Sequence, residues 1–383
     1  MVPILVAFLT LATTGIFHTI LGTALPAIQA FLGMDTAQTG LFASFAWLGF
    51  TAAIFAGGIL SDIFEQNLIL MLACITVGLS STFFGFSSLF GLNCLLISLL
   101  GAGTGVISSS SSALVMKFYP RKEGLMINIH HFFYGIGAIT GPLSMGYVLK
   151  QGWDWQWVYR AGGLWMLLLA GILAFQKKQP QIHKRPMIDK SFFTLIREKN
   201  LLLLILITLF GCGTYNGVSL WLVSFLKEIR SFPIFQASLG LSLFSTGLAI
   251  GRLLSDWLSS RIGNTKVLLL LLSFLSLALL LFLLTTGSAA ILGICFMAGL
   301  GSSGLYPVVL ALAGINFPRQ SGTTIGILGT SAGIGNMFVP WLMSVVSQGS
   351  SLKGGFLIGH FTALIALGLV SLYYGRLNRS EAK

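Results

Sequence analysis

The chain has 383 residues, of which 55% are hydrophobic and only 8% are charged. A soluble domain carries about 25% charged residues, so a soluble enzyme or nucleic-acid-binding protein of this length is excluded. The 22 Lys and Arg residues outnumber the 10 Asp and Glu residues, which gives a formal net charge of +12. This composition is typical of an integral membrane protein.

Apolar stretches long enough to cross a bilayer, about 20 residues each, follow one another along the whole chain. Seven charge-free stretches hold one helix each: 1–34, 36–61, 124–149, 200–226, 231–251, 320–352 and 354–375. The segment 155–175 holds one more. Two longer stretches each hold two helices joined by a short uncharged hairpin, and these are 66–116 and 267–318. We therefore predict an all-α polytopic membrane protein with twelve transmembrane helices, the first of them retained rather than cleaved.

The orientation follows from the Lys and Arg residues, which are enriched in cytoplasmic loops. With both termini in the cytoplasm, 17 of these residues lie inside and five lie outside, namely Lys150, Arg160, Lys227, Arg230 and Lys353. We expect a multi-pass protein of the inner (plasma) membrane with both ends in the cytoplasm. The positive charge then reflects topology, and nucleic acid is not an expected partner.

The chain contains an internal repeat. Residues 177–200 form its only long polar stretch and separate two segments of six predicted helices each, 1–176 and 201–383. A shift of 198 residues aligns Phe118-Tyr-Pro-Arg-Lys-Glu-Gly124 with Asn316-Phe-Pro-Arg-Gln-Ser-Gly322 and also aligns His18 with Asn216. We predict two six-helix bundles joined by a basic cytoplasmic linker.

This 6+6 duplication with a basic central loop resembles the major facilitator superfamily, and the resemblance covers essentially the whole chain. It implies two bundles related by a pseudo-twofold axis along the membrane normal, with a substrate site between them. It also implies a secondary transporter that works by alternating access, rather than an enzyme. We expect a monomer that lies in the lipid bilayer, binds a small-molecule substrate, and needs neither a cofactor nor a metal ion.

The superfamily carries a Gly-x-x-x-Asp motif between helices 2 and 3, which Gly58 and Asp62 match here. A fuller copy occupies residues 251–263 in the second half. A carboxylate at a helix end that faces an arginine of the neighbouring bundle can hold one side of the transporter shut. We predict such a gate, with ordinary interfacial charges as the alternative, and its residues are Asp62, Arg121, Arg252, Asp256 and Arg319.

Polar side chains inside the spans are candidate substrate contacts, because they are costly in lipid. No Asp or Glu falls in mid-span, and Arg160 is the only predicted cation inside a span, near its mouth. Aromatic rings with amide and imidazole groups favour a neutral polyhydroxy solute such as a sugar over an anion. Hydrogen bonds that only hold the bundle together are the alternative for the histidines. The candidates are His18, Asn128, His131, Tyr134, Tyr215, Asn216, Trp221, Tyr306 and Asn336.

The run from Asn128 to Pro142 on helix 5 is similar to the fucose–proton symporter branch of the superfamily, which implies sugar symport. Within it, His131 shares a helix face with Asn128, whereas His130 points about 100° away. Helix 7 departs from that branch, with Ser219 at its acidic position, so proton and sodium coupling both stay open. Gly141-Pro142 with Gly146 partly resembles a motif of drug–proton antiporters, and a drug or metabolite exporter is the alternative function.

Overall fold

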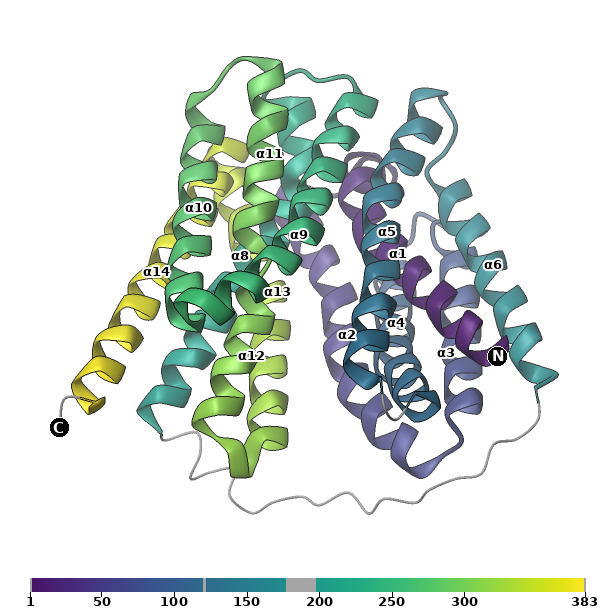
Figure 1. Ribbon diagram of the computed structural model, residues 1–383. Helices are drawn as coiled ribbons and strands as arrows, with labels where there is room; N and C mark the ends of the chain where they lie inside the picture. Colours follow the sequence, from purple (N-terminus) through teal and green to yellow (C-terminus); the bar gives the residue numbers. More distant parts are fainter. Residues whose placement is uncertain (1, 120–121, 177–197, 382–383) are drawn as a thin grey trace. The chain divides into compact units, whose positions relative to one another are not determined.

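The computed structural model describes residues 2–119, 122–176 and 198–381, and within these ranges the regular structure is entirely helical. The first half contains six long helices (Figure 1). They are α1 (Val2–Leu32), α2 (Thr36–Ile63), α3 (Gln66–Phe83), α4 (Phe90–Phe118), α5 (Glu123–Lys150) and α6 (Gln156–Ala174).

The second half repeats this series with one interruption. It comprises α8 (Lys199–Glu228), α9 (Ile234–Ile262), α10 (Asn264–Leu284), α11 (Ser288–Ser302), α12 (Leu305–Asn316), the 3₁₀ turn η1 (Pro318–Gln320), α13 (Ser321–Gly349) and α14 (Leu352–Glu381). The short helices α11 and α12 together form one span, Ser288–Asn316. The described residues therefore hold twelve candidate membrane spans, as predicted.

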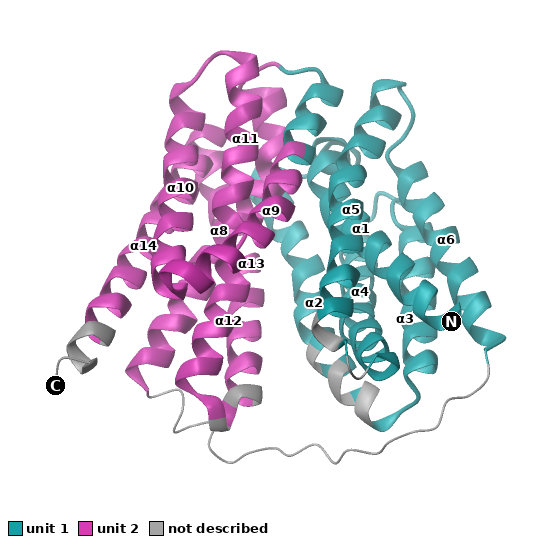
Figure 2. Cartoon of the chain, in the orientation of Figure 1, with its two compact units in different colours: residues 1–187, 232–242 teal, residues 188–231, 243–383 magenta. Residues whose placement is uncertain are grey.

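The chain divides into two compact units (Figure 2), and α9 is shared between them. Unit 1 comprises residues 1–187 and 232–242, and unit 2 comprises residues 188–231 and 243–383. Unit 1 thus contains α1 to α6 and the start of α9, and unit 2 contains the rest of α9 and the helices after it, together with α8. The predicted linker lies mostly outside the described residues.

The two units use the same helix pairs. In unit 1, α1 packs against α5, and α3 against α6; in unit 2, α8 packs against α13, and α10 against α14. The match extends to single contacts, because a Cβ on Gly101 would collide with the carbonyl oxygen of Ala46, and one on Gly299 would collide with that of Phe244. Both residues of the second contact are offset by 198 from those of the first, so the repeat is expressed in backbone packing as well as in sequence.

An aromatic cluster closes one end of each unit. In unit 1, Phe84 packs edge-on against Trp155 and Tyr159 at 5.0 and 4.9 Å between ring centroids. In unit 2, Phe282, which is offset from Phe84 by 198 residues, packs against Phe225 and Phe356 at 5.2 and 5.7 Å. Each edge-to-face pair contributes about 0.5–1.5 kcal/mol beyond its buried area. Both units therefore have an aromatic core of their own.

Candidate functional site

A histidine in the middle of α1 is the centre of a polar cluster in unit 1. His18 Nδ1 lies 3.1 Å from the hydroxyl of Tyr134 on α5, and its Nε2 lies 3.4 Å from the hydroxyl of Thr104 on α4. Thr104 donates its own proton to the carbonyl oxygen of Gly101 at 2.8 Å. Its oxygen is then an acceptor, so the neutral ring carries its proton on Nε2 and accepts the Tyr134 proton on Nδ1.

Two aromatic residues of α2 cover this imidazole. The rings of Trp47 and Phe50 have centroids 5.5 and 5.2 Å from that of His18. A cavity of about 30 Å³ opens beside them, lined by α1, α2 and α4. It has room for about one or two water molecules. The cavity is too small for a sugar ring in this structure, but its aromatic walls beside an imidazole and a phenol are the chemistry that stacks on and hydrogen-bonds a hydroxylated ring.

The helical phase predicted for α5 is confirmed. His130 is fully buried, packs edge-on against Phe8, and lies 3.2 Å from the carbonyl oxygen of Ala7 through Nε2. His131 and Asn128 lie on another face and are exposed. Asn128, His131 and Tyr134 follow one another at successive turns, so a row of polar groups along α5 leads to the half-buried Tyr134 beside His18.

In unit 2, two asparagines meet at a proline. Pro340 has no N–H group, so the carbonyl oxygen of Asn336, four residues earlier on α13, loses its helical partner. The side-chain amide of Asn216 on α8 donates to that oxygen at 2.9 Å. The Oδ1 atom of Asn336 is buried without a partner among the described residues. The side chain of Asn216 therefore has a structural role, because it joins α8 to α13. The side-chain oxygen of Asn336 is still available as a hydrogen-bond acceptor.

The prediction for Trp221 needs correction. Its side chain is only 2% exposed, and its indole N–H donates to the carbonyl oxygen of Pro340 at 3.1 Å. Trp221 therefore fastens α8 to α13 in the core instead of facing a solute. The other aromatic candidates of this unit are more open, because Tyr215, which stacks on Phe244 at 6.1 Å, and Tyr306 are half-buried.

The sequence missed Trp47, Phe50 and Thr104. A tryptophan usually marks the end of a span, at the membrane surface. Trp47 instead lies near the middle of α2. This unusual position is the sequence feature from which Trp47 could have been predicted to belong to a site. Thr104 has no such signal, because threonines commonly bond their own helix and only the fold brings this one to His18.

Comparison with known proteins agrees with these observations. The family model of the Major Facilitator Superfamily matches residues 7–295 and 223–383. The chain belongs to this superfamily. Consistent with that, the structure resembles that of a mutant of the nucleoside transporter NupG, with a TM-score of 0.82, 13% identity, and coverage of 98% of this chain and 99% of that one.

Among superfamily members, the chain is similar to two proteins named for sugar substrates. It is 24% identical to a probable hexose phosphate transport protein of Chlamydia muridarum, over 92% of this chain and 84% of the relative. It is 23% identical to the glucose/mannose transporter GlcP of Bacillus subtilis, over 93% and 88%. As a superfamily member, the chain is a transporter and not an enzyme, and the described residues contain no cluster of metal-binding side chains.

Only part of the predicted gate can be examined. Arg121 and the side chains of Asp62 and Arg319 lie outside the described residues. Asp256 is exposed and Arg252 is half-buried, and neither forms an ion pair within the described part of the chain. The gate stays a prediction for the three undescribed side chains.

The helix that contains Arg252 is longer than the charge-free stretch from which it was predicted. The charge-free stretch 231–251 suggested that the helix ends at this residue, whereas α9 continues to Ile262. Ten further residues at 1.5 Å each place Arg252 about 15 Å before that end. Arg252 therefore lies within α9 instead of at its end.

Proposed function

We propose that this superfamily member is a secondary active transporter that moves a small hydroxylated solute, such as a sugar, across the inner membrane by alternating access. The observation that carries the proposal is the hydrogen-bonded His18–Tyr134 pair beneath the rings of Trp47 and Phe50. These groups offer a stacking surface and hydrogen bonds at mid-span, which suits a sugar ring. The names of the hexose phosphate and glucose/mannose relatives support the same solute class.

In this proposal both termini are cytoplasmic, as the Lys and Arg distribution favours. The transporter works as a monomer. A hydroxyl group of the solute replaces Thr104 as the hydrogen-bond partner of His18 Nε2, Tyr134 holds the imidazole through Nδ1, and the exposed Asn128 and His131 line the approach along α5. A histidine is also the group whose charge changes near neutral pH, so it can carry a coupling proton.

The test is uptake of labelled sugars into liposomes that contain the purified protein, with and without a proton or sodium gradient. We expect Tyr134→Phe to reduce uptake at low sugar concentration by about ten-fold, the effect of one lost hydrogen bond of roughly 1.4 kcal/mol. Tyr147→Phe is the matched control, because Tyr147 lies on the same helix and is exposed. Equal loss in both variants, or none in either, would count against the site.

The same assay addresses coupling and the alternative function. Accumulation that follows an imposed pH gradient, and disappears in His18→Gln, supports proton symport; accumulation that follows sodium supports sodium symport. Efflux of hydrophobic cations in exchange for protons, with no sugar uptake, would favour the drug or metabolite exporter instead.

A further inference from the structure

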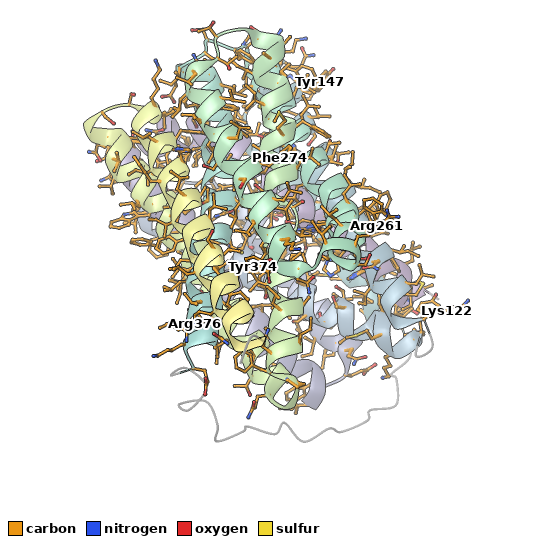
Figure 3. The ribbon with its side chains drawn as sticks, turned by 60° about the vertical axis from the view of Figure 1, so that its left-hand side comes forward. Lys122, Tyr147, Arg261, Phe274, Tyr374 and Arg376 are labelled. Carbon is orange, nitrogen blue, oxygen red and sulfur yellow. The ribbon has the colours of Figure 1, made fainter. Side chains whose placement is uncertain are left out.

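A groove runs between α10 and α14 on an exposed side of unit 2. Figure 3 turns this side forward, with Phe274 on α10 and Tyr374 on α14. The volume of the groove is about 380 Å³, within the range of roughly 300–1,000 Å³ of pockets that bind small molecules. Both helices are candidate membrane spans, so the groove opens toward lipid rather than toward water. Its apolar walls are formed by leucines, namely Leu277, Leu280, Leu364 and Leu367.

A histidine and a serine in this groove have free hydrogen-bonding atoms. His360 Nδ1 lies 3.0 Å from the backbone carbonyl oxygen of Ser276 and 3.2 Å from its hydroxyl. A carbonyl oxygen can only accept, so Nδ1 of the neutral ring carries the proton and Nε2 is an acceptor. Neither Nε2 nor the exposed hydroxyl of Ser273 forms a hydrogen bond among the described residues. One acceptor and one donor are therefore available to a ligand.

The leucine walls extend to both sides of these polar groups. Phe282 packs on Phe356 at 5.7 Å between ring centroids, whereas Ser276 contacts His360, so α10 and α14 run antiparallel. The two leucines of α10 therefore lie on one side of the imidazole, and the two leucines of α14 lie on the other. A ligand with a long apolar chain finds an apolar wall in either direction.

The chemistry of the groove selects among the molecules that a membrane contains. Lipid chains offer no hydrogen bonds, so an unpaired imidazole nitrogen and hydroxyl are costly there. The ester groups of ordinary phospholipids carry only acceptors and cannot pair with Nε2. A fitting ligand brings an O–H donor beside an acceptor, joined to an apolar chain, and an acid-form carboxyl group carries both.

We propose that this groove binds a long-chain fatty acid, with the carboxyl group on His360 and Ser273 and the chain along the leucines. The acid O–H donates to Nε2, and the carboxyl C=O oxygen accepts from the hydroxyl of Ser273. Transfer of the acid proton to Nε2 would leave an imidazolium and a carboxylate joined by a stronger, charge-assisted hydrogen bond. The site belongs to unit 2 and goes beyond the proposed transport function, whose centre is His18 in unit 1.

Binding of labelled lauric acid to the purified full-length protein in phosphatidylcholine nanodiscs tests this inference. Saturable binding is measured above that of empty nanodiscs for wild type, His360→Leu and Ser273→Ala. Methyl laurate is the matched competitor, because it keeps the chain and the C=O oxygen but lacks the O–H donor. Ser371→Ala is the matched control variant, because Ser371 is exposed on α14 and its hydroxyl donates to the carbonyl oxygen of Leu367 in its own helix at 2.9 Å.

We expect equal binding by wild type and Ser371→Ala. The affinity for lauric acid falls by roughly ten-fold in His360→Leu and by roughly three-fold in Ser273→Ala, each the effect of one lost hydrogen bond. Methyl laurate competes at least about ten-fold more weakly than unlabelled lauric acid. Ser273→Ala keeps the test valid even where His360→Leu does not fold, because the Ser273 hydroxyl bonds nothing in the described part of the chain.

Three results would overturn the inference. They are no saturable binding by wild type, equal competition by methyl laurate, and unchanged affinity in both groove variants. Light scattering in detergent addresses the other possible occupant of an exposed groove, a second copy of this chain. A wild-type dimer that Ser273→Ala converts to a monomer would assign the groove to that copy and also overturn the fatty-acid site.

Discussion

Substitution of Asn216 by Ala gives a sharp test of how α8 is fastened to α13. The amide of Asn216 is the donor for the Asn336 carbonyl oxygen, at 2.9 Å, and Pro340 deprives that oxygen of its helical partner. Hydrogen bonds between membrane helices contribute about 0.6 kcal/mol on average and up to about 1.7 kcal/mol. Asn216 is only 7% exposed, so water cannot replace the lost donor. We expect a cost near the upper value, about 1.5 kcal/mol.

The control is the same substitution in a Pro340→Ala background. Alanine restores the backbone N–H at this position, which donates to the Asn336 carbonyl oxygen as in an ordinary helix. Asn216→Ala should then cost about 0.5 kcal/mol or less, leaving a coupling energy of about 1 kcal/mol between the two positions. The measurement is the free energy of unfolding in mixed detergent micelles for all four proteins. Equal costs of Asn216→Ala in both backgrounds would refute the reasoning.

Four further substitutions have defined outcomes in the same unfolding assay. Trp221→Phe removes the hydrogen bond to Pro340 and should cost about 1 kcal/mol, with sugar affinity in the uptake assay unchanged. Gly101→Ala should cost about 1–3 kcal/mol by overpacking, whereas Gly171→Ala, with open space around it, should be neutral or stabilising. Arg230→Gln removes a charged donor at 2.6 Å from a carbonyl oxygen at the end of α10 and should cost about 1.5–3 kcal/mol. A change in sugar affinity for Trp221→Phe, or a cost for Gly171→Ala as large as that for Gly101→Ala, would contradict these assignments.

The number of spans and the internal repeat could be predicted from the sequence, because both depend on patterns along the chain. Charge-free length sets the spans, and the 198-residue offset needs no knowledge of packing. The phase of α5 was predictable for the same reason, since about 100° per residue separates His130 from His131 whatever lies around them. These features are local, and the fold did not alter them.

The candidate site was less predictable, because its residues come together only in the fold. Trp47 and Phe50 pack over His18 only because α1 and α2 lie against each other in the fold. The sequence pattern of a single helix does not contain this information. Trp221 was predicted to be a solute contact because an aromatic ring can stack on a sugar, yet its indole N–H donates to a carbonyl oxygen of α13. The end of α9 was also hard to predict, because the helix continues past the charge of Arg252 as far as Ile262.

The glycine contacts constrain the kinematics of the molecule. Where a carbonyl oxygen occupies the place of a missing Cβ, as between Gly101 and Ala46 and between Gly299 and Phe244, sliding or separating the helices forfeits contacts that no other residue type could restore. The helices α2 and α4 must therefore move together as one rigid pair during the transport cycle. The same holds for α9 and α11. The hinge points of that cycle belong where a helix is interrupted, such as the break between α11 and α12 around Ser303.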